Sequence, residues 1–498
     1  MNKLNYLPPT LLCDFYKITH RNQYPEGTEY IYSTWTPRTS RVEGVNEVIA
    51  FGFQGFIKKY LMDYFNDYFF KLPLEKVIND YKLVILHTLG EDQCDTTHIE
   101  ALHKLGYLPL KISAVEEGTL IPIRVPMLTL ENTHKDFAWV TNYIETLMSC
   151  MLWQQTTSAT LSLQYRYILE KYAKETDIDN METVKFQAHD FSMRGMSSLE
   201  TCSISGTGHL LNFLGTDTIP SIIYLQQYYN TELNKELIGS SVPATEHSVM
   251  CAYGEDNELE TYRHLIEDVY PKGIFSVVSD TWNLWNVITN FLPKLKDSIM
   301  AREGKVVIRP DSGLPEDILC GNPSGSTEEE RKGVIELLWD IFGGTVNSQG
   351  YKVLDSHIGA IYGDAITTKR CIAICERLKQ KGFASTNVVF GVGSFTYQYN
   401  TRDTFGFALK STYAIINGEE KFLFKNPITD NGVKKSQRGK VCVMKTHGGI
   451  KLIDTLDSKN EELYSKNNLI QPIFENGVLL KETSLKEIRD RITQNIGL

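Results

Sequence analysis

Lys305-Val306-Val307-Ile308-Arg309-Pro310-Asp311-Ser312-Gly313 is a run of β-branched residues that ends abruptly in charged residues, proline and glycine. Such a run predicts a buried strand whose carboxyl end carries polar groups. The same layout recurs at residues 275–280, 358–364 and 387–394, and a helical pattern occupies residues 367–381 between the last two. Alternation of strands and helices predicts parallel strands, and active sites in such sheets and barrels lie at the carboxyl edge.

Three of these predicted strands end in a carboxylate, at Asp280, Asp311 and Asp364. Any one of them, taken alone, is more often the cap of the next helix. Four polar strand ends together, one of them also bearing Arg309, favour a shared site instead. Carboxylates that meet at strand ends can bind Mg²⁺ through water or hold the hydroxyls of a ribose.

The two ends of the chain have a different pattern, in which helices are mixed with hairpins. Residues 110–118 and 120–125 read as paired strands with a turn at Glu117-Gly118, and residues 441–452 read as a hairpin with Gly448-Gly449 at its turn. We therefore predict an α/β protein in which an irregular (β/α) barrel domain, residues 181–394, is inserted in an α+β domain built from residues 1–180 and 395–498.

Composition excludes several classes of protein. A chain of 498 residues is long enough for two or three domains, and its net charge of -10 argues against a nucleic-acid partner. The nine cysteines include no CxxC pair and no cluster with zinc-ligand spacing. The first residues lack a secretory pattern, and no run of 18 apolar residues predicts a membrane span. We expect a cytoplasmic protein with no membrane contact.

Further motifs indicate a flat ligand and phosphate groups. Phe191 and Arg194 follow one predicted strand, where a ring can stack on a flat ligand and a guanidinium can bind an anion, although a core Phe beside a surface Arg is the ordinary alternative. The small residues that end in Gly393-Ser394 would let backbone N–H groups close on a phosphate. Basic clusters around Arg38 and around Lys425 and Lys434 suit phosphates too, with a solvated charged face as the alternative.

Six motifs, in this order along the chain, resemble the nicotinamide phosphoribosyltransferase family: Leu12–His20, His189–Gly195, Gly215–Asp217, Ser241–Ser248, Val278–Asp280 and Ile308–Gly313. The resemblance runs from about Leu11 to the C-terminus. It implies a type II phosphoribosyltransferase fold and a homodimer with shared active sites. It also implies the reaction of nicotinamide with 5-phosphoribosyl 1-pyrophosphate, which gives nicotinamide mononucleotide and pyrophosphate in NAD salvage, depends on Mg²⁺ and is stimulated by ATP.

The resemblance implies a role for each matched residue. The nicotinamide ring would lie between Phe191 and Tyr16 of the partner subunit, with Asp217 on the carboxamide and Arg309 nearby. Asp14 of the partner subunit would also lie close by. The ribose would be bound by Asp311, Gly363 and Asp364, and the 5′-phosphate by Gly393, Ser394 and Arg402. The pyrophosphate would be bound by Arg38, Arg194, His247, Lys425 and Lys434. Asp280 and Asp311 would bind Mg²⁺ through water. His247 would also be the residue that ATP phosphorylates. Ser394 stands where some members of the family have Gly.

The chemistry that this family implies needs little proton transfer, because the pyridine nitrogen has no proton to lose. His247, Asp311, Arg194 and Asp280 are therefore predicted to act by positioning and by stabilising charge. Two alternatives remain. One is a phosphoribosyltransferase that uses nicotinate, against which Asp217 argues because it would repel a second carboxylate. The other is a catalytically silent nucleotide-binding protein on the same scaffold, against which the full set of polar residues argues.

Overall fold

A computed structural model of the protein describes residues 3–363, 365–429 and 436–496. The chain forms two compact units. The first, here called the antiparallel unit, comprises residues 1–160, 224–232 and 400–498, and the second, the parallel unit, comprises residues 161–223 and 233–399. The first division falls inside helix α6 (Glu145–Thr176), whereas the sequence predicted domain boundaries at residues 180 and 394.

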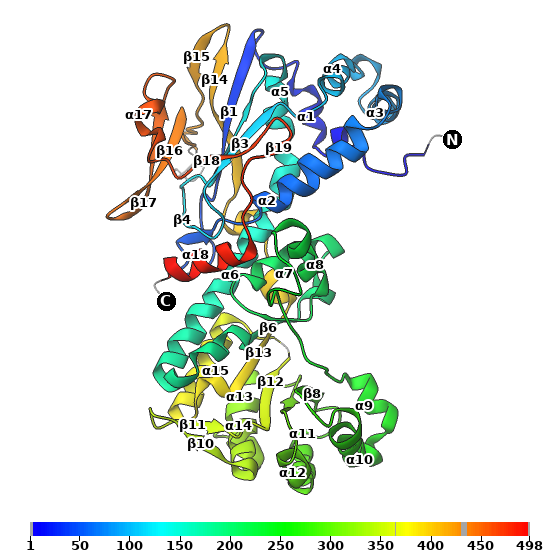
Figure 1. The fold of residues 1–498 in the computed structure, drawn as a ribbon, viewed down its shortest axis with the longest axis vertical. Helices are drawn as coiled ribbons and strands as arrows, with labels where there is room; N and C mark the ends of the chain where they lie inside the picture. The colour runs from blue at the N-terminus through cyan, green and yellow to red at the C-terminus, as the bar shows by residue number, and fades with distance from the viewer. Residues whose placement is uncertain (1–2, 364, 430–435, 497–498) are drawn as a thin grey trace. The chain divides into compact units, whose positions relative to one another are not determined.

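The parallel unit is built on a sheet of six parallel strands (Figure 1). Its strands, in spatial order, are β7 (Gly215–Thr216), β6 (Ala188–Asp190), β13 (Val388–Val392), β12 (Ile358–Tyr362), β9 (Val306–Arg309) and β8 (Phe275–Val278). All four strands predicted from β-branched runs are therefore confirmed as neighbours. Every residue of β12 is buried, which explains why its sequence is apolar without alternation.

A single segment, residues 240–245, connects the two edges of this sheet. Thr216 of β7 donates its backbone N–H to the carbonyl of Ser240 (2.9 Å), and Thr245 donates its N–H to the carbonyl of Ser276 in β8 (3.0 Å). The sheet therefore curls, and this segment bridges its edge strands. The predicted irregular barrel is confirmed.

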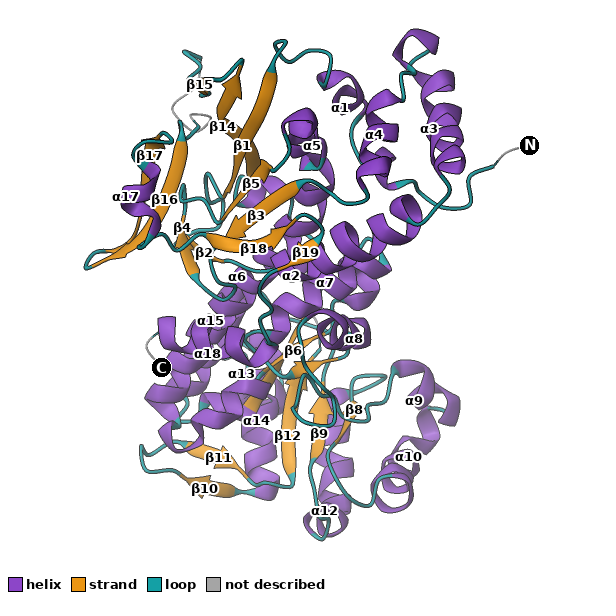
Figure 2. Ribbon diagram, turned by 45° about the horizontal axis from the view of Figure 1, so that its top comes forward, coloured by secondary structure: helices purple, strands orange, loops and turns teal. Residues whose placement is uncertain are grey.

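Helices surround these strands (Figure 2). The predicted helix at residues 367–381 is confirmed as α15 (Thr368–Gln380), which starts at the cap residue Thr367 and buries one stripe of side chains, including Cys371, Ile374 and Leu378. The other helices of this unit are α7 (Leu199–Leu210), α9 (His247–Tyr253), α10 (Glu258–His264), α11 (Leu284–Asn286), α12 (Leu292–Met300), α13 (Pro315–Cys320), α14 (Glu328–Phe342) and α16 (Ser394–Tyr397). Helix α8 (Ile219–Tyr228) contains residues of both units.

The antiparallel unit contains a seven-stranded antiparallel sheet. Its order is β15 (Glu419–Phe422), β14 (Ala408–Ile416), β1 (Thr28–Thr36), β5 (Leu128–Asn132), β3 (Leu110–Ala114), β18 (Gln471–Glu475) and β19 (Val478–Leu479). Its helices are α1 (Phe15–His20), α2 (Phe53–Phe56), α3 (Leu74–Thr88), α4 (Thr97–Leu105), α5 (Ala138–Tyr143), α17 (Glu461–Ser465) and α18 (Leu485–Asn495). The helical chain of α2 continues in π-helical form over Ile57–Tyr64 and Asn66–Phe70.

One predicted hairpin of this unit is confirmed and the other is wrong. Strands β16 (Lys440–Thr446) and β17 (Gly449–Leu456) pair as expected around their glycine turn. In contrast, β3 pairs with β5 and β18, while β4 (Leu120–Pro122) pairs with β2 (Glu47–Ile49) in a separate sheet. The expected turn does not close a hairpin because Glu117 is buried, and its carboxylate accepts the backbone N–H of Gln54 at the start of α2 (3.0 Å). No helix among the described residues is both long and apolar enough to cross a membrane.

Candidate active site

A cavity of about 1410 Å³ lies at the carboxyl ends of the parallel strands, and all its lining residues belong to the parallel unit. Its volume exceeds the usual range of small-ligand pockets, roughly 300–1,000 Å³, and leaves room for two substrates. Nine residues singled out from the sequence line it: Phe191, Arg194, Asp217, His247, Arg309, Asp311, Gly363, Gly393 and Ser394. Residues from three of the four polar strand ends predicted from the sequence, those after β9, β12 and β13, therefore line one cavity, whereas Asp280 after β8 is not among its lining residues.

Phe191 forms an aromatic wall of the cavity. It follows β6, and its backbone N–H donates to the carbonyl of Val392 in the neighbouring strand β13 (2.9 Å). The strand beside it carries Gly391, where a Cβ atom would lie only 2.7 Å from the Phe191 ring. Glycine at that position lets the ring lie close to the sheet, and the ring remains available for stacking on a flat ligand.

Asp217 is held by two donors. Its Oδ1 atom lies 2.8 Å from Nε2 of His189 and accepts a hydrogen bond from Oγ of Ser241 (2.5 Å). Burial raises the pKa of this carboxyl, but the hydrogen bonds from His189 and Ser241 outweigh it and hold the pKa below its usual value. Asp217 is thus an ionised acceptor at neutral pH. His189 belongs to a motif recognised in the sequence, but its role beside Asp217 was not predicted.

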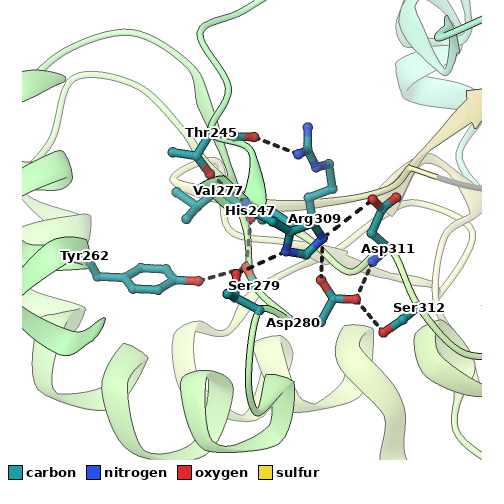
Figure 3. A network of polar contacts seen from close by, with 11 residues as sticks. Thr245, His247, Tyr262, Val277, Ser279, Asp280, Arg309, Asp311 and Ser312 are labelled. Atoms are coloured by element: carbon teal, nitrogen blue, oxygen red, sulfur yellow. Dashed lines mark hydrogen bonds and ion pairs between the residues drawn. The ribbon is translucent and has the colours of Figure 1, made fainter. Parts of the chain in front are cut away.

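The carboxylates of Asp280 and Asp311, which follow β8 and β9, lie close to the imidazole of His247, the first residue of α9 (Figure 3). Asp280 accepts the backbone N–H of Asp311 (2.8 Å) and the hydroxyl of Ser312 (2.6 Å) through Oδ2. Nε2 of His247 lies 3.9 Å from Oδ1 of Asp280 and 3.8 Å from Oδ2 of Asp311. His247 is about half exposed, so one imidazole faces both the carboxylates and the solvent.

These carboxylates also fit a hydrated divalent cation. Oδ1 of Asp280 is buried and has no hydrogen-bond partner within the described part of the chain, so it is an anionic oxygen that still needs a ligand. Among the residues that the structure describes, no three His, Cys, Asp or Glu side chains form a ready-made metal cage. Two carboxylates with water suit Mg²⁺, which usually retains several water ligands.

Arg309 is a half-buried cation of the site. Its Nη2 donates to the carbonyl of Thr245 (2.6 Å), and Thr245 in turn accepts the N–H of Val278 through Oγ1 (2.9 Å). Burial lowers the pKa of Arg309, while the nearby carboxylates of Asp311 and Asp217 raise it. Residues 240–245 and strand β8 thus hold a guanidinium near the carboxylates of Asp311, Asp217 and Asp280.

Small residues let the loops of the site approach one another. A Cβ atom on Gly363 would lie 2.6 Å from Oδ1 of Asp311, and one on Gly195 would lie 2.1 Å from Oγ of Ser394. Gly393 caps α16, and Ser394 is its first residue. Arg194, next to Gly195, is therefore carried by a loop that packs on the predicted phosphate loop.

Other predicted residues do not line this cavity. Five of them, Asp14, Tyr16, Arg38, Arg402 and Lys425, belong to the antiparallel unit. Tyr16 is 55% exposed, Asp14 accepts a hydrogen bond from Thr146 (2.9 Å), and Nε of Arg38 donates to the carbonyl of Gly406 (2.8 Å). Asp364 and Lys434 lie outside the described residues.

Sequence reasoning missed a third arginine of the cavity, Arg370. It lies in the first turn of α15 and donates Nη1 to the carbonyl of Ala365 (2.8 Å). The only signal for it was a basic side chain three residues after the helix cap Thr367, which is unremarkable on a surface helix.

Comparison with known proteins agrees with these observations. Residues 186–472 match the nicotinate phosphoribosyltransferase (NAPRTase) family, and residues 10–67 match the nicotinamide phosphoribosyltransferase N-terminal domain. The chain is 48% identical to nicotinamide phosphoribosyltransferase of Acinetobacter baylyi over 98% of this chain and 97% of that protein. It is 37% identical to the protein of the same name from Mycoplasma pneumoniae over 85% and 93% of the two chains.

Two solved structures are similar in fold. Nicotinate-nucleotide pyrophosphorylase from Pyrococcus furiosus aligns over 100% of both chains with a TM-score of 0.57 at 15% identity. Human nicotinic acid phosphoribosyltransferase aligns over 97% of this chain and 93% of its own with a TM-score of 0.54 at 14% identity. At such identities the likeness concerns the fold alone, and it confirms the predicted type II phosphoribosyltransferase architecture.

Proposed function

Because the chain belongs to the nicotinamide phosphoribosyltransferase family, and is thus an enzyme of the phosphoribosyltransferase class, we propose that it joins nicotinamide to 5-phosphoribosyl 1-pyrophosphate. The products are nicotinamide mononucleotide and pyrophosphate, and the reaction serves NAD salvage. One observation carries the choice of nicotinamide: Asp217 is an ionised acceptor in the cavity that Phe191 lines. It suits the N–H₂ of a carboxamide and repels a carboxylate.

The reaction exchanges one bond at C1 of the ribose. The bond from C1 to the pyrophosphate oxygen breaks, and its electron pair leaves with pyrophosphate. The lone pair of the pyridine nitrogen forms the new bond, so no proton has to move. The protein's task is to hold the ring on Phe191 and the ribose hydroxyls on Asp311, while Arg194 stabilises the charge of the leaving group. Bound Mg²⁺ would neutralise pyrophosphate charge from a site at Asp280 and Asp311.

ATP stimulation is a further part of the proposal, with His247 as the phosphoacceptor. Its support is geometric, because the imidazole is about half exposed and both its carboxylate neighbours stand at Nε2. We expect His247→Ala to lose ATP hydrolysis and ATP stimulation but to keep some transfer without ATP. Acid-labile phosphate on the variant after incubation with ATP would show that another residue is phosphorylated.

The second candidate function uses nicotinate in place of nicotinamide. The match of residues 186–472 to the nicotinate phosphoribosyltransferase family favours it. One assay separates the two: kcat/KM for nicotinamide and for nicotinate, each with and without ATP and Mg²⁺. The proposal requires nicotinamide to be the better substrate, and a preference for nicotinate would overturn it.

The proposal includes a homodimer with shared sites and a cytoplasmic location. Tyr16 and Asp14 would complete the nicotinamide site of the partner subunit, and Arg38, Arg402 and Lys425 would bring positive charge to its phosphates. The exposure of the Tyr16 ring supports this assignment, because an exposed aromatic side chain on α1 is available to another subunit.

A further inference from the structure

The loops that follow β12 and β13 form one end of the cavity. The two strands are parallel neighbours, with Ala360 opposite Val388. Beyond them, the buried Tyr165 joins their loops, because its hydroxyl donates to the carbonyl of Ile366 (3.0 Å) and lies 2.8 Å from Oγ1 of Thr396. The chain that leads into α15 and the helix that begins at Ser394 are therefore held together.

Arg370 belongs to this end of the cavity. Its Nη1 donates to the carbonyl of Ala365 (2.8 Å), and its Nε lies 4.0 Å from Oε2 of Glu316. Within the described part of the chain no acceptor is found for Nη2, although a guanidinium has five N–H donors. About a third of the side chain is exposed, and the residue lines the cavity. The hydrogen bond to Ala365 thus holds the Arg370 side chain in place, and its Nη2 donors remain available to a ligand.

We infer that Arg370 binds the 5′-phosphate of the ribose substrate together with the Gly393-Ser394 loop. This inference rests on the proposed function, which brings a phosphorylated ribose to that loop. The contacts favour the 5′-phosphate over pyrophosphate, because Arg370 and the Gly393-Ser394 loop follow neighbouring strands whose loops Tyr165 joins, whereas Asp280 follows β8 at an edge of the sheet. A guanidinium binds phosphate through two parallel hydrogen bonds, which a single loop of backbone N–H groups does not provide.

A purely structural role is the competing explanation. Ala365 has a positive φ of 56°, a conformation that L residues rarely adopt, and the hydrogen bond from Arg370 could serve only to hold it. Two substitutions separate these roles. Arg370→Gln keeps an N–H donor but removes the charge, and Arg370→Lys keeps the charge but removes the planar fork.

The test is direct binding, measured by calorimetry, of ribose 5-phosphate and of pyrophosphate to the full-length protein. We expect Arg370→Gln to bind ribose 5-phosphate at least about tenfold more weakly, equivalent to about 1.4 kcal/mol, and to bind pyrophosphate within about twofold of the wild type. Arg370→Lys should be intermediate. Lys369→Ala is the matched control, since it removes a neighbouring exposed charge that does not line the cavity.

Three results would overturn the inference: unchanged ribose 5-phosphate binding by Arg370→Gln, equal weakening for both ligands, or no binding of ribose 5-phosphate by the wild type. An equal fall in Tm for both substitutions, with the two ligands affected alike, would identify the structural role. Failure of the proposed function looks different, because the wild type would then bind ribose 5-phosphate but would not convert nicotinamide. In active protein, Arg370→Gln should raise KM for 5-phosphoribosyl 1-pyrophosphate and leave KM for nicotinamide unchanged.

Discussion

Asp217 owes its charge to two neighbours, and that charge predicts which pyridine the enzyme accepts. Replacing Asp217 with Asn keeps the shape but removes the repulsion of a carboxylate, while His189 and Ser241 lose their anionic acceptor. We expect Asp217→Asn to shift the ratio of kcat/KM for nicotinamide over nicotinate by at least about tenfold toward nicotinate, or about 1.4 kcal/mol. The two substrates are compared under identical conditions. An unchanged ratio would mean that Asp217 does not contact the amide.

The sequence predicts some residues of this site better than others. Asp280, Arg309 and Asp311 could be found because a strand run ends directly in them, and the ends of parallel strands meet at one edge. The role of His189 could not be found in this way. It lies inside a short strand, and its contact with Asp217 depends on the pairing of β6 with β7, which no local pattern encodes. Arg370 was missed for a different reason, because a basic side chain in the first turn of a helix is ordinary on a protein surface.

Gly391 in strand β13 leaves room for the Phe191 ring because glycine has no side chain. A Cβ on Gly391 would meet the Phe191 ring at 2.7 Å and the carbonyl of Tyr362 at 2.8 Å. We expect Gly391→Ala to lower the free energy of unfolding by about 1–3 kcal/mol and to raise KM for nicotinamide, because the ring must move. Thermal unfolding and steady-state kinetics measure both effects.

Gly359→Ala in the adjacent strand β12 is the matched control. Its Cβ would lie 3.1 Å from Cδ of Lys305, a flexible side chain that can move aside. This variant should stay close to the wild type in both Tm and KM. Equal effects of the two substitutions would show that glycine in these strands matters for general stability and not for the position of Phe191.

The turn after β3, where the sequence wrongly predicted a hairpin, has a pH-dependent consequence. Burial raises the pKa of Glu117 to about 7 from 4.5, although hydrogen bonds from Gln54 and neighbouring N–H groups lower it. The folded protein therefore holds this proton more tightly than the unfolded chain. The contribution of Glu117 to the free energy of unfolding is fully present below about pH 4.5. It is lost as the pH rises toward 7, by about 3 kcal/mol in total.

Glu117→Gln should remove this dependence, because an amide does not titrate. We expect the Tm of the variant, relative to the wild type, to rise between about pH 5 and pH 8. The difference between the two proteins at each pH is the quantity to measure, since other groups titrate in both. Parallel curves would mean that Glu117 keeps its ordinary pKa in the folded protein.

The assembly of the fold from distant parts of the chain was visible in the sequence, but the position of the division was not. Helices mixed with hairpins at both chain ends predicted that the two ends form one domain, and the pairing of β1 with β14 joins them in one sheet. The compact units divide at Thr160, inside α6, and the antiparallel unit also takes residues 224–232 from the middle of the chain. A continuous helix has no change of pattern at such a division, so composition cannot reveal it.

The proposed shared site predicts how two inactive variants behave when they are mixed. Tyr16 belongs to the antiparallel unit and Asp311 to the parallel unit, so a dimer with one Tyr16→Ala and one Asp311→Ala subunit would contain one intact site. After free subunit exchange, half of the dimers are hybrids, and activity should return to about a quarter of the wild type. Tyr16→Ala mixed with Arg402→Ala is the control. Both changes lie in the antiparallel unit, so every hybrid site is defective and activity should stay low. Recovery in neither mixture, after exchange has been verified with labelled subunits, would place each active site within a single subunit.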